Sequence, residues 1–481
     1  MSKYESPYPF INNTNNLYFK NYNYKEYNNP INNPQKKYNS FVQNGKRILS
    51  EANDLPYKIT NQNSNKKGHS FFQNPKFSGT DNLTSQTNVY SFIQDNKRNK
   101  ILEDFSNYNF YQNKNNYRSL DVKEKNIIND YENNNNIEEK LNLIISSQIG
   151  LKNLGYTCYM NACLQNLIHS KYFIRELLSK RSIINESKTP ITKEFLKLCE
   201  KMSTSKTSSI DPSDFRYIFC KKHKEFGKYA QFDTIEFCRY LLEDISSELN
   251  EIKVKTPYRE LSTVGKSKIQ CYNEFWQFYV SKEYSIVVKC FYGSFINIFT
   301  CTCNHKTYSF QVFLDFPLLI PEGMNKTSID ELLFQYFKKE SINFNTKCEK
   351  CYIKTVHDKE IKFSELPNIL ILSLQRMDAR TNKKNNCKIK FEEKLILDDY
   401  IDNECQKGEK YIYYLYGVWC HRGIINDGHY YSYIKINDKY WYEFNDSKVN
   451  NVGYIETMSK DAYVLLYKKT KRKQLRTYKY L

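Results

Sequence analysis

The stretch that decides the fold of this chain runs from Gly150 to Leu167 and reads GLKNLGYTCYMNACLQNL. From Met160 onward, apolar residues recur at the spacing of one helix face, which predicts a helix that starts at or near Cys158. The unpaired N–H groups and the dipole at a helix N-terminus favour a thiolate over a thiol. Cys158 is therefore a candidate nucleophile.

A possible helper lies five residues before this cysteine, on a turn flanked by glycines. The side-chain amide of Asn153 could point at the atom that Cys158 attacks. The alternative is a structural cysteine buried in a loop-to-helix joint, so the rest of the chain has to decide between the two interpretations.

Composition divides the 481 residues into two parts. Residues 1–140 contain 32 Asn and no Cys, whereas all 14 cysteines lie from Cys158 onward. The first part lacks a sustained apolar period, so we expect a disordered low-complexity extension. The chain has no apolar run of about 18 residues and no apolar signal region at its start, which predicts an intracellular protein without a membrane span. Scattered cysteines without an export signal fit a reducing compartment.

The formal net charge is +19, and the stretch from Lys468 to Leu481 contributes seven basic residues and no acid. We delimit a basic tail at 469–481. Such a run could bind nucleic acid or anionic lipid, or permit nuclear import, and a merely solvated tail is the simpler interpretation. We therefore expect the protein in the cytoplasm, the nucleus or both.

The periodicity of the chain changes along its length. Residues 171–250 are predicted to be mainly helical. From about residue 285 the period moves towards two, which predicts strands, with a helical insert at 328–340. The expected strands are 286–288, 295–299, 310–316, 369–374, 411–419, 429–436, 439–444 and 462–468. Helices followed by antiparallel strands predict an α+β fold.

An amphipathic helix is predicted at 231–245, and two acidic residues, Asp233 and Glu236, lie near its start. Carboxylates are favoured there by the helix dipole, which is the simpler interpretation. The alternative is an acidic site for a basic peptide.

A second candidate constellation lies near the C-terminus. His429 starts one predicted strand, and Asn437-Asp438 is expected to turn the chain back in a tight hairpin. The returning strand ends at Asn445 and Asp446, so its end should lie close to His429. A histidine oriented by an Asn or Asp oxygen can activate a cysteine, and the order Cys, His, Asn/Asp is that of papain-like proteases.

Taken together, these residues resemble the ubiquitin-specific proteases, which are papain-like cysteine deubiquitinases. Residues 150–165 are similar to the cysteine box of that family, and residues 416–433 with 441–446 are similar to its histidine box. The smaller family blocks appear in order at 231–242, 276–293, 310–321 and 366–376. The resemblance covers residues 148–468 and implies one catalytic domain, with a papain-like fold of thumb, palm and zinc-ribbon-like fingers.

The resemblance implies an enzyme that hydrolyses isopeptide or peptide bonds after the C-terminal Gly of ubiquitin through an acyl-enzyme thioester. Cys158 would be the nucleophile and His429 the general base. Asn445 or Asp446 would orient the histidine, and Asn153 would stabilise the oxyanion.

The same resemblance implies how the substrate would bind. Asp233 and Glu236 would face the arginines of the ubiquitin tail, and Gly428 and Tyr430 would line the narrow channel for its terminal Gly-Gly. The chain departs from the family at Tyr156, where a small or polar residue is usual two places before the cysteine.

A structural zinc site at the tip of the fingers is also implied. Cys348 and Cys351 form a CxxC pair, and Cys303 lies 45 residues before the first of them. The other half-site departs from the pattern, because Cys301 and Cys303 form CxC. A one-residue slip could let Cys301 bind the metal, His305 could replace it, or the finger could be metal-free.

We therefore expect ubiquitin and ubiquitinated proteins as partners, no specific nucleic acid, a monomer, and no cofactor for catalysis. One alternative is a catalytically weak ubiquitin-binding scaffold of the same fold. A zinc-ribbon nucleic-acid protein would account for the cysteine pairs and the charge, but it leaves the cysteine and histidine boxes unexplained.

Overall fold

The computed structural model of the chain describes residues 135–254, 256–257, 259, 261–343, 347–378, 383–406, 410–424, 427–453, 455 and 458–470. The predicted disorder of residues 1–140 lies outside the described part up to residue 134, and so does the basic tail from residue 471. Residues 135–145 are helical. Regular structure thus begins ahead of the boundary expected at residue 140.

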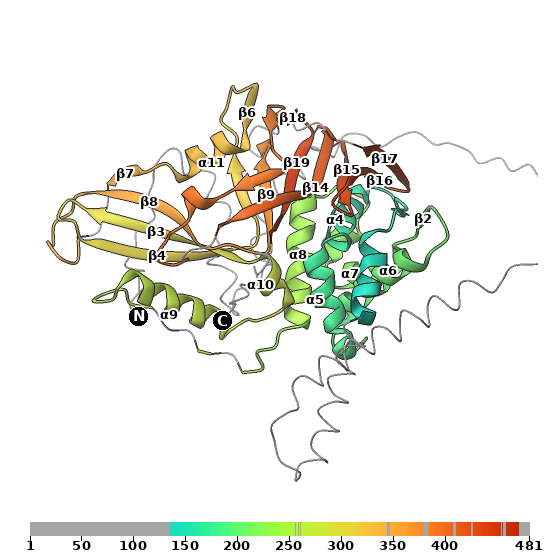
Figure 1. Ribbon diagram of the computed structural model, residues 1–481, viewed down its shortest axis with the longest axis horizontal. Coiled ribbons are helices and arrows are strands. Elements are labelled where there is room, and N and C mark those ends of the chain that lie inside the picture. The colour runs from blue at the N-terminus through green and yellow to red at the C-terminus, as the bar shows by residue number, and fades with distance from the viewer. Residues whose placement is uncertain are drawn as a thin grey trace, which may run out of the picture. The chain divides into compact units, whose positions relative to one another are not determined.

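Helices make up the first half of the described chain (Figure 1). The prediction of helices over 171–250 is confirmed. The helices are α4 (Cys158–Ile168), α5 (Lys171–Ser179), α6 (Pro190–Thr204), α7 (Ser213–Lys222), α8 (Thr234–Glu248), α9 (Lys268–Val280) and α10 (Ile286–Phe291), with short 3₁₀ turns at Arg181–Ile183 and Lys224–Gly227.

Helix α10 corrects one expectation, because residues 286–288 were predicted to be a strand. The Ser285 hydroxyl accepts a hydrogen bond from the N–H of Val288 at 3.3 Å and caps this helix. Five of its six residues are buried. A short apolar run that is buried on all sides has no period that separates strand from helix, so the cap decided the outcome.

The larger sheet has eight strands, and all its pairings are antiparallel except that of β5 with β9. Helices followed by such a sheet confirm the predicted α+β class. The strand order is β17 (Lys448–Gly453), β16 (Tyr440–Asn445), β15 (Gly428–Ile436), β14 (Ile412–Gly423), β19 (Ala462–Lys469), β9 (Ile369–Gln375) and β5 (Phe316–Leu319), with β13 (Lys394–Ile396) also paired to β14.

A second sheet of four strands leads away from α10 (Figure 1). Helix α11 (Ile329–Phe337) matches the insert predicted at 328–340. The four strands are β4 (Lys306–Phe313), β3 (Gly293–Cys301), β8 (Val356–Glu365) and β7 (Glu340–Asn343). Smaller pairings join β1 (Gly150–Leu151) to β2 (Ser209–Ile210), β10 (Met377–Asp378) to β11 (Lys383–Lys384), and β12 (Lys388–Lys390) to β6 (Lys326–Ser328) and β18 (Met458–Ser459).

Helix α4 is buried along its whole length, between the neighbouring helices and strands β14, β15 and β16. Two contacts bring the strands close to it. A Cβ added at Gly417 of β14 would lie 1.9 Å from the Asn166 amide oxygen, so only glycine fits there. The Ser432 hydroxyl of β15 donates to the Ala162 carbonyl at 3.0 Å. The sheet is thereby held against the helix that begins with Cys158.

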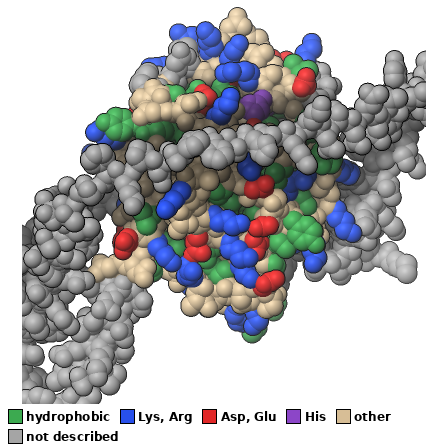
Figure 2. Space-filling model, turned by 90° about the vertical axis from the view of Figure 1, so that its right-hand side faces the viewer, with side chains coloured by type: hydrophobic (Ala, Val, Ile, Leu, Met, Phe, Trp, Pro, Cys, Tyr) green, Lys and Arg blue, Asp and Glu red, His purple; other side chains and the backbone are tan. Residues whose placement is uncertain are grey.

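The surface carries both signs of charge. On the face shown in Figure 2, Lys and Arg side chains are interspersed with Asp and Glu. In the described part of the chain, the helices are all too short or too polar to cross a bilayer.

Candidate active site

Cys158 is the first residue of α4, and its side chain is 4% exposed. The prediction that a helix starts at this cysteine is confirmed. The turn before it is built by Thr157, whose hydroxyl accepts from the N–H of Leu154 at 2.8 Å. The positive end of the α4 dipole therefore lies at Cys158.

The hairpin predicted around Asn437-Asp438 brings a histidine to this cysteine. Both turn residues have positive φ, 52° and 58°, as a type I′ turn requires. The strands that it joins, β15 and β16, place His429 beside Asn445, with 2.7 Å between Nε2 and Oδ1. An amide oxygen only accepts, so Nε2 carries the proton, and the other ring nitrogen is left for Cys158.

The pKa of His429 is raised to about 9. Its hydrogen bond with Cys158 is the largest cause, and burial acts against the shift. The hydrogen bond to Asn445 and the charges of Cys158 and Asp446 raise the pKa further. At neutral pH the imidazole is therefore protonated, which is the state that pairs with a thiolate.

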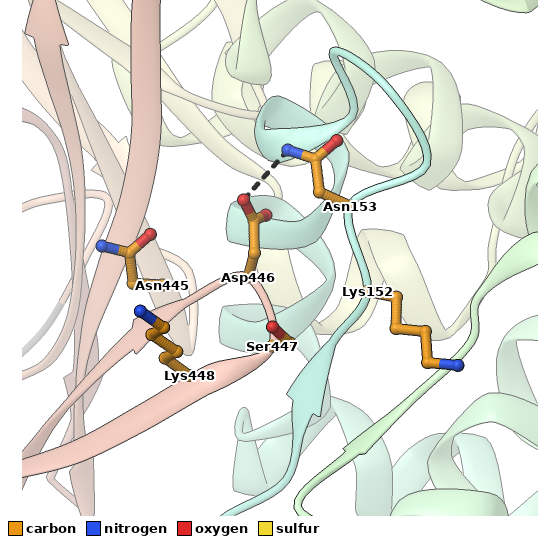
Figure 3. Close-up of a pocket in the computed structure, with 6 residues that line it drawn as sticks. All are labelled: Lys152, Asn153, Asn445, Asp446, Ser447 and Lys448. Atoms are coloured by element: carbon orange, nitrogen blue, oxygen red, sulfur yellow. Dashed lines mark hydrogen bonds between the residues drawn. The ribbon is translucent and has the colours of Figure 1, made fainter.

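Asp446 has different partners from Asn445, although the sequence left open which of the two orients the histidine. Its Oδ2 lies 4.0 Å from His429 Nε2. The carboxylate instead accepts from Asn153 Nδ2 at 2.9 Å and from Asn161 Nδ2 at 2.8 Å, and its carbonyl accepts from the N–H of Leu151 at 2.9 Å. Asp446 thus ties the end of β16 to α4 and to the loop before it (Figure 3).

Asn153 is held by both halves of its amide. Its oxygen accepts from the N–H of Gly155 at 3.0 Å and from the N–H and hydroxyl of Thr157, each at 3.2 Å. Its nitrogen donates one hydrogen to Asp446. The amide carries two hydrogens, so one remains for the predicted oxyanion.

A cavity of about 490 Å³ lies at this junction. Figure 3 shows Asn153 and Asp446 pointing towards each other across it, while the Lys152 side chain points away from them. Its lining residues are Lys152, Asn153, Asn445, Asp446, Ser447 and Lys448.

Tyr156, the departure noted from the sequence, lies two residues before the nucleophile in a left-handed backbone conformation. Its φ is +57°, and its side chain is 54% exposed. A bulky residue with such a φ is uncommon and costs free energy. More than half of the side chain is therefore in contact with solvent.

The two acids at the start of α8 differ in their surroundings. Asp233 is the N-cap, and its Oδ1 accepts from the N–H groups of Ile235 at 2.7 Å and Glu236 at 3.3 Å, while Oδ2 accepts from the Tyr463 hydroxyl. The Glu236 side chain is exposed. Burial raises the pKa of the Asp233 carboxyl, and partial desolvation by its neighbours together with the charge of Asp233 raises that of Glu236. Asp233 therefore has the capping role of the simpler interpretation, and Glu236 is the acid that faces solvent.

Sequence reasoning missed two polar residues that build this site. Asn161 lies three residues after Cys158 on the same side of α4 and donates to Asp446, and the available signal was its polar side chain one turn after the cysteine. Gln231 accepts from the N–H of Gly428 at 2.9 Å and fixes the start of β15 beside α8. Tyr430, also on β15, is 5% exposed.

Four cysteines gather at the end of the four-stranded sheet. Cys301 Sγ lies 3.8 Å from Cys351 Sγ, and Cys303 Sγ lies 3.6 Å from Cys348 Sγ. All four sulfurs lie within 4.8 Å of one another. The tight turn after β3 brings Cys301 into the group, because its N–H bonds the His305 carbonyl and Asn304 has a φ of +61°. This cluster can bind a metal ion.

The fold and both boxes define the class of protein. The sequence model of the ubiquitin carboxyl-terminal hydrolases matches residues 149–467, and the chain belongs to this family. It is 27% identical over 360 residues to ubiquitin carboxyl-terminal hydrolase 4 of Saccharomyces cerevisiae, which covers 66% of this chain and 39% of that protein. It is 28% identical over 355 residues to human ubiquitin carboxyl-terminal hydrolase 21, covering 68% of this chain and 62% of the relative.

The fold resembles that of a solved deubiquitinase. One similar structure is a SAGA DUB module, Ubp8/Sgf11/Sus1/Sgf73, bound to monoubiquitin, with a TM-score of 0.55, 26% identity and coverage of 68% of this chain and 70% of that chain. Another is the same module bound to ubiquitin aldehyde, with a TM-score of 0.53, 27% identity and coverage of 67% and 70%. The predicted resemblance to ubiquitin-specific proteases is confirmed.

Proposed function

We propose that this chain is a thiol-dependent deubiquitinase that hydrolyses isopeptide or peptide bonds after the C-terminal Gly of ubiquitin. One observation carries the proposal: His429 is hydrogen-bonded to Asn445 through Nε2, and Cys158, at the start of α4, is the largest cause of the raised pKa of the ring. The family of the chain supports it. A scaffold that only binds ubiquitin does not require a buried thiol, a charged imidazole and an amide that orients the imidazole at one site.

In the proposed reaction, the Cys158 thiolate attacks the carbonyl carbon of the terminal Gly, and the carbonyl oxygen becomes an oxyanion. The free N–H of Asn153 and the backbone N–H at the start of α4 are the candidate donors to that oxygen. The His429 imidazolium gives its proton to the leaving amine, and a thioester remains. Water then loses a proton to His429 and attacks the thioester, which releases the ubiquitin carboxylate and Cys158.

The proposed substrate is a ubiquitin tail, which enters between β15 and α8. Ubiquitin is present in both of the similar solved structures described above. The arginines of the ubiquitin tail need an acidic contact. Glu236 is an exposed acid in the first turn of α8, and Asp233 lies beside it as the N-cap. Gly428 and Tyr430 belong to the strand that would face the terminal Gly-Gly. A Cβ at Gly428 would lie 2.1 Å from Nε2 of the buried His421, so glycine lets that ring pack against the start of the strand.

We also propose that the cysteine cluster holds a structural Zn²⁺ through Cys301, Cys303, Cys348 and Cys351. Tetrahedral thiolates at about 2.3 Å from zinc lie about 3.8 Å apart. The separations of 3.6 Å between Cys303 and Cys348 and 3.8 Å between Cys301 and Cys351 agree with this geometry. The metal would fasten the β3–β4 turn to the segment before β8 and take no part in the reaction.

The test is a ubiquitin probe with an electrophilic C-terminus, combined with a fluorogenic ubiquitin substrate. The intact chain should be labelled and should turn over the substrate, whereas Cys158→Ala should do neither and still bind ubiquitin. Cys199→Ala, a buried cysteine of α6, is the matched control and should keep both activities. Labelling of the Cys158→Ala variant by the probe would refute the assignment of Cys158 as the nucleophile. Ubiquitin binding by the intact chain without turnover would favour the scaffold alternative.

A further inference from the structure

We propose that the corner between α4 and α5 binds a phosphoryl group, which goes beyond the proposed function. A cavity of about 250 Å³ lies there, with Ser170, Lys171 and Tyr416 among its lining residues. It is at the opposite end of α4 from Cys158, roughly 16 Å away for an 11-residue helix. The cavity is therefore separate from the candidate active site.

Two buried hydroxyls of this cavity lack partners. Tyr416 is 3% exposed and Ser170 is 2% exposed, and neither hydroxyl makes a hydrogen bond of normal geometry with any described residue. The two are near enough to interact. Even a bond between them would use only one of their two protons, so one donor would still lack an acceptor. Buried donors without an acceptor are rare and costly, and here they line a space that a ligand can fill.

The start of α5 adds a second reason to expect an anion. Its N-cap is Ser170, a residue type that usually accepts from a first-turn N–H, yet its side chain makes no capping bond. The first turn contains no acid, and its first residue is the cation Lys171. A positive side chain beside the positive end of a helix dipole is unfavourable by itself. A bound anion would stabilise both the dipole and the lysine.

The remaining charges at the cavity are also mostly positive. Lys435 and Lys468 line it, and the first pairs with Glu393 at 2.6 Å while the second pairs with Asp438. Among the described residues, none forms an ion pair with Lys171. The buried His169 ring is held by the carbonyls of Gln165 and Ser147 and is not available to a ligand. The cavity thus offers at least one hydroxyl donor without an acceptor, one helix N-terminus and one free ammonium.

This set of donors fits a tetrahedral oxoanion, whose oxygens accept in several directions at once. The phosphoryl group can come from free phosphate or from a phosphorylated side chain. Titration calorimetry on the full chain, with inorganic phosphate at constant ionic strength, should detect saturable binding. A parallel titration with O-phosphoserine separates the sources: a lower Kd for phosphoserine indicates a modified side chain, and an equal or higher Kd indicates the free ion.

Matched variants tie binding to this cavity. Tyr416→Phe should raise the Kd for phosphate by about tenfold or more, because a hydrogen bond to a charged group is lost. Lys171→Gln should raise it several-fold. Tyr413→Phe and Lys180→Gln are the controls and should leave the Kd unchanged. Tyr413 lies on β14 like Tyr416, but its hydroxyl donates to the Pro367 carbonyl. Lys180 lies at the other end of α5 and pairs with Glu251.

Thermal unfolding without phosphate gives a readout that separates ligand binding from a structural role. Tyr416→Phe should keep or raise the Tm, since it removes a hydroxyl without a partner, whereas Tyr413→Phe should lower it. The absence of saturable phosphate binding by the intact chain, or a Kd that Tyr416→Phe leaves unchanged, would overturn the proposal.

Discussion

The Asp446 carboxylate accepts a hydrogen bond from the side-chain amide of Asn153, with 2.9 Å between Oδ2 and Nδ2. The neighbouring Asn445 instead accepts from His429. Two adjacent residues at the end of β16 therefore have separate tasks. Asn445 orients the proposed base, and Asp446 positions the proposed oxyanion donor.

This division predicts different pH profiles for two alanine variants. Asn445→Ala should lower kcat/KM about 10- to 100-fold and move the alkaline limb of the profile to lower pH, because its hydrogen bond helps to raise the pKa of His429. Asp446→Ala should lower kcat by a similar factor and move the limb less, since its charge is the smallest cause of that shift. The pH dependence of fluorogenic ubiquitin hydrolysis measures both. Identical shifts in the two variants would contradict the division.

The raised pKa of His429 makes a second prediction. The imidazolium is needed to protonate the leaving amine, so kcat/KM should fall as pH rises through about 9. The folded-state pKa lies above the ordinary value of 6.5, so the stability that this group contributes is fully present below pH 6.5 and is lost as pH rises through about 9. Measured by urea unfolding, the difference in free energy of unfolding between the intact chain and His429→Gln should shrink as pH rises from 6.5 through about 9. If this difference in free energy of unfolding grows with pH instead, His429 is not an imidazolium in the folded protein.

Tyr156 predicts a stabilising substitution beside the nucleophile. A non-glycine residue in the left-handed region costs about 1–2 kcal/mol, and asparagine tolerates it better than tyrosine. Tyr156→Asn should therefore raise the free energy of unfolding by roughly 0.5–1 kcal/mol. Tyr217→Asn, an exposed position on helix α7, is the control and should be neutral or slightly destabilising. A lower Tm for Tyr156→Asn would show that the ring makes contacts that outweigh the backbone cost.

The cysteine cluster predicts one zinc per chain. Elemental analysis of the purified protein should find it, and Cys348→Ser should lose it together with several degrees of Tm, because the β3–β4 turn loses its fastening. Cys220→Ser on α7 is the control and should retain the metal. Hydrolysis of a minimal substrate by Cys348→Ser should fall much less than by Cys158→Ala. A metal content of zero in the intact chain would refute the proposed site.

The sequence predicted most elements that have a clear period or a turn signal. The helix at 231–245, four strands from residue 411 onward and the hairpin at Asn437-Asp438 were found in this way, whereas β17 (Lys448–Gly453) was missed. It failed at 286–288, where a short apolar run is buried in a helix. Periodicity cannot decide such a run, because every side of it faces the core.

The sequence by itself determined which residues are chemically able to act, since a cysteine at a helix start and a histidine at the start of a strand were evident from their neighbours. Only the tertiary structure decided their partners. Whether Asn445 or Asp446 meets His429 depends on the β15–β16 register and on the positive φ of Asp446, which turns its side chain towards α4. Likewise, Cys301 joins the cysteine cluster because the turn after β3, closed by its N–H and the His305 carbonyl, brings its sulfur beside that of Cys351. Distances between segments far apart in the chain are set by packing, and local sequence patterns do not encode them.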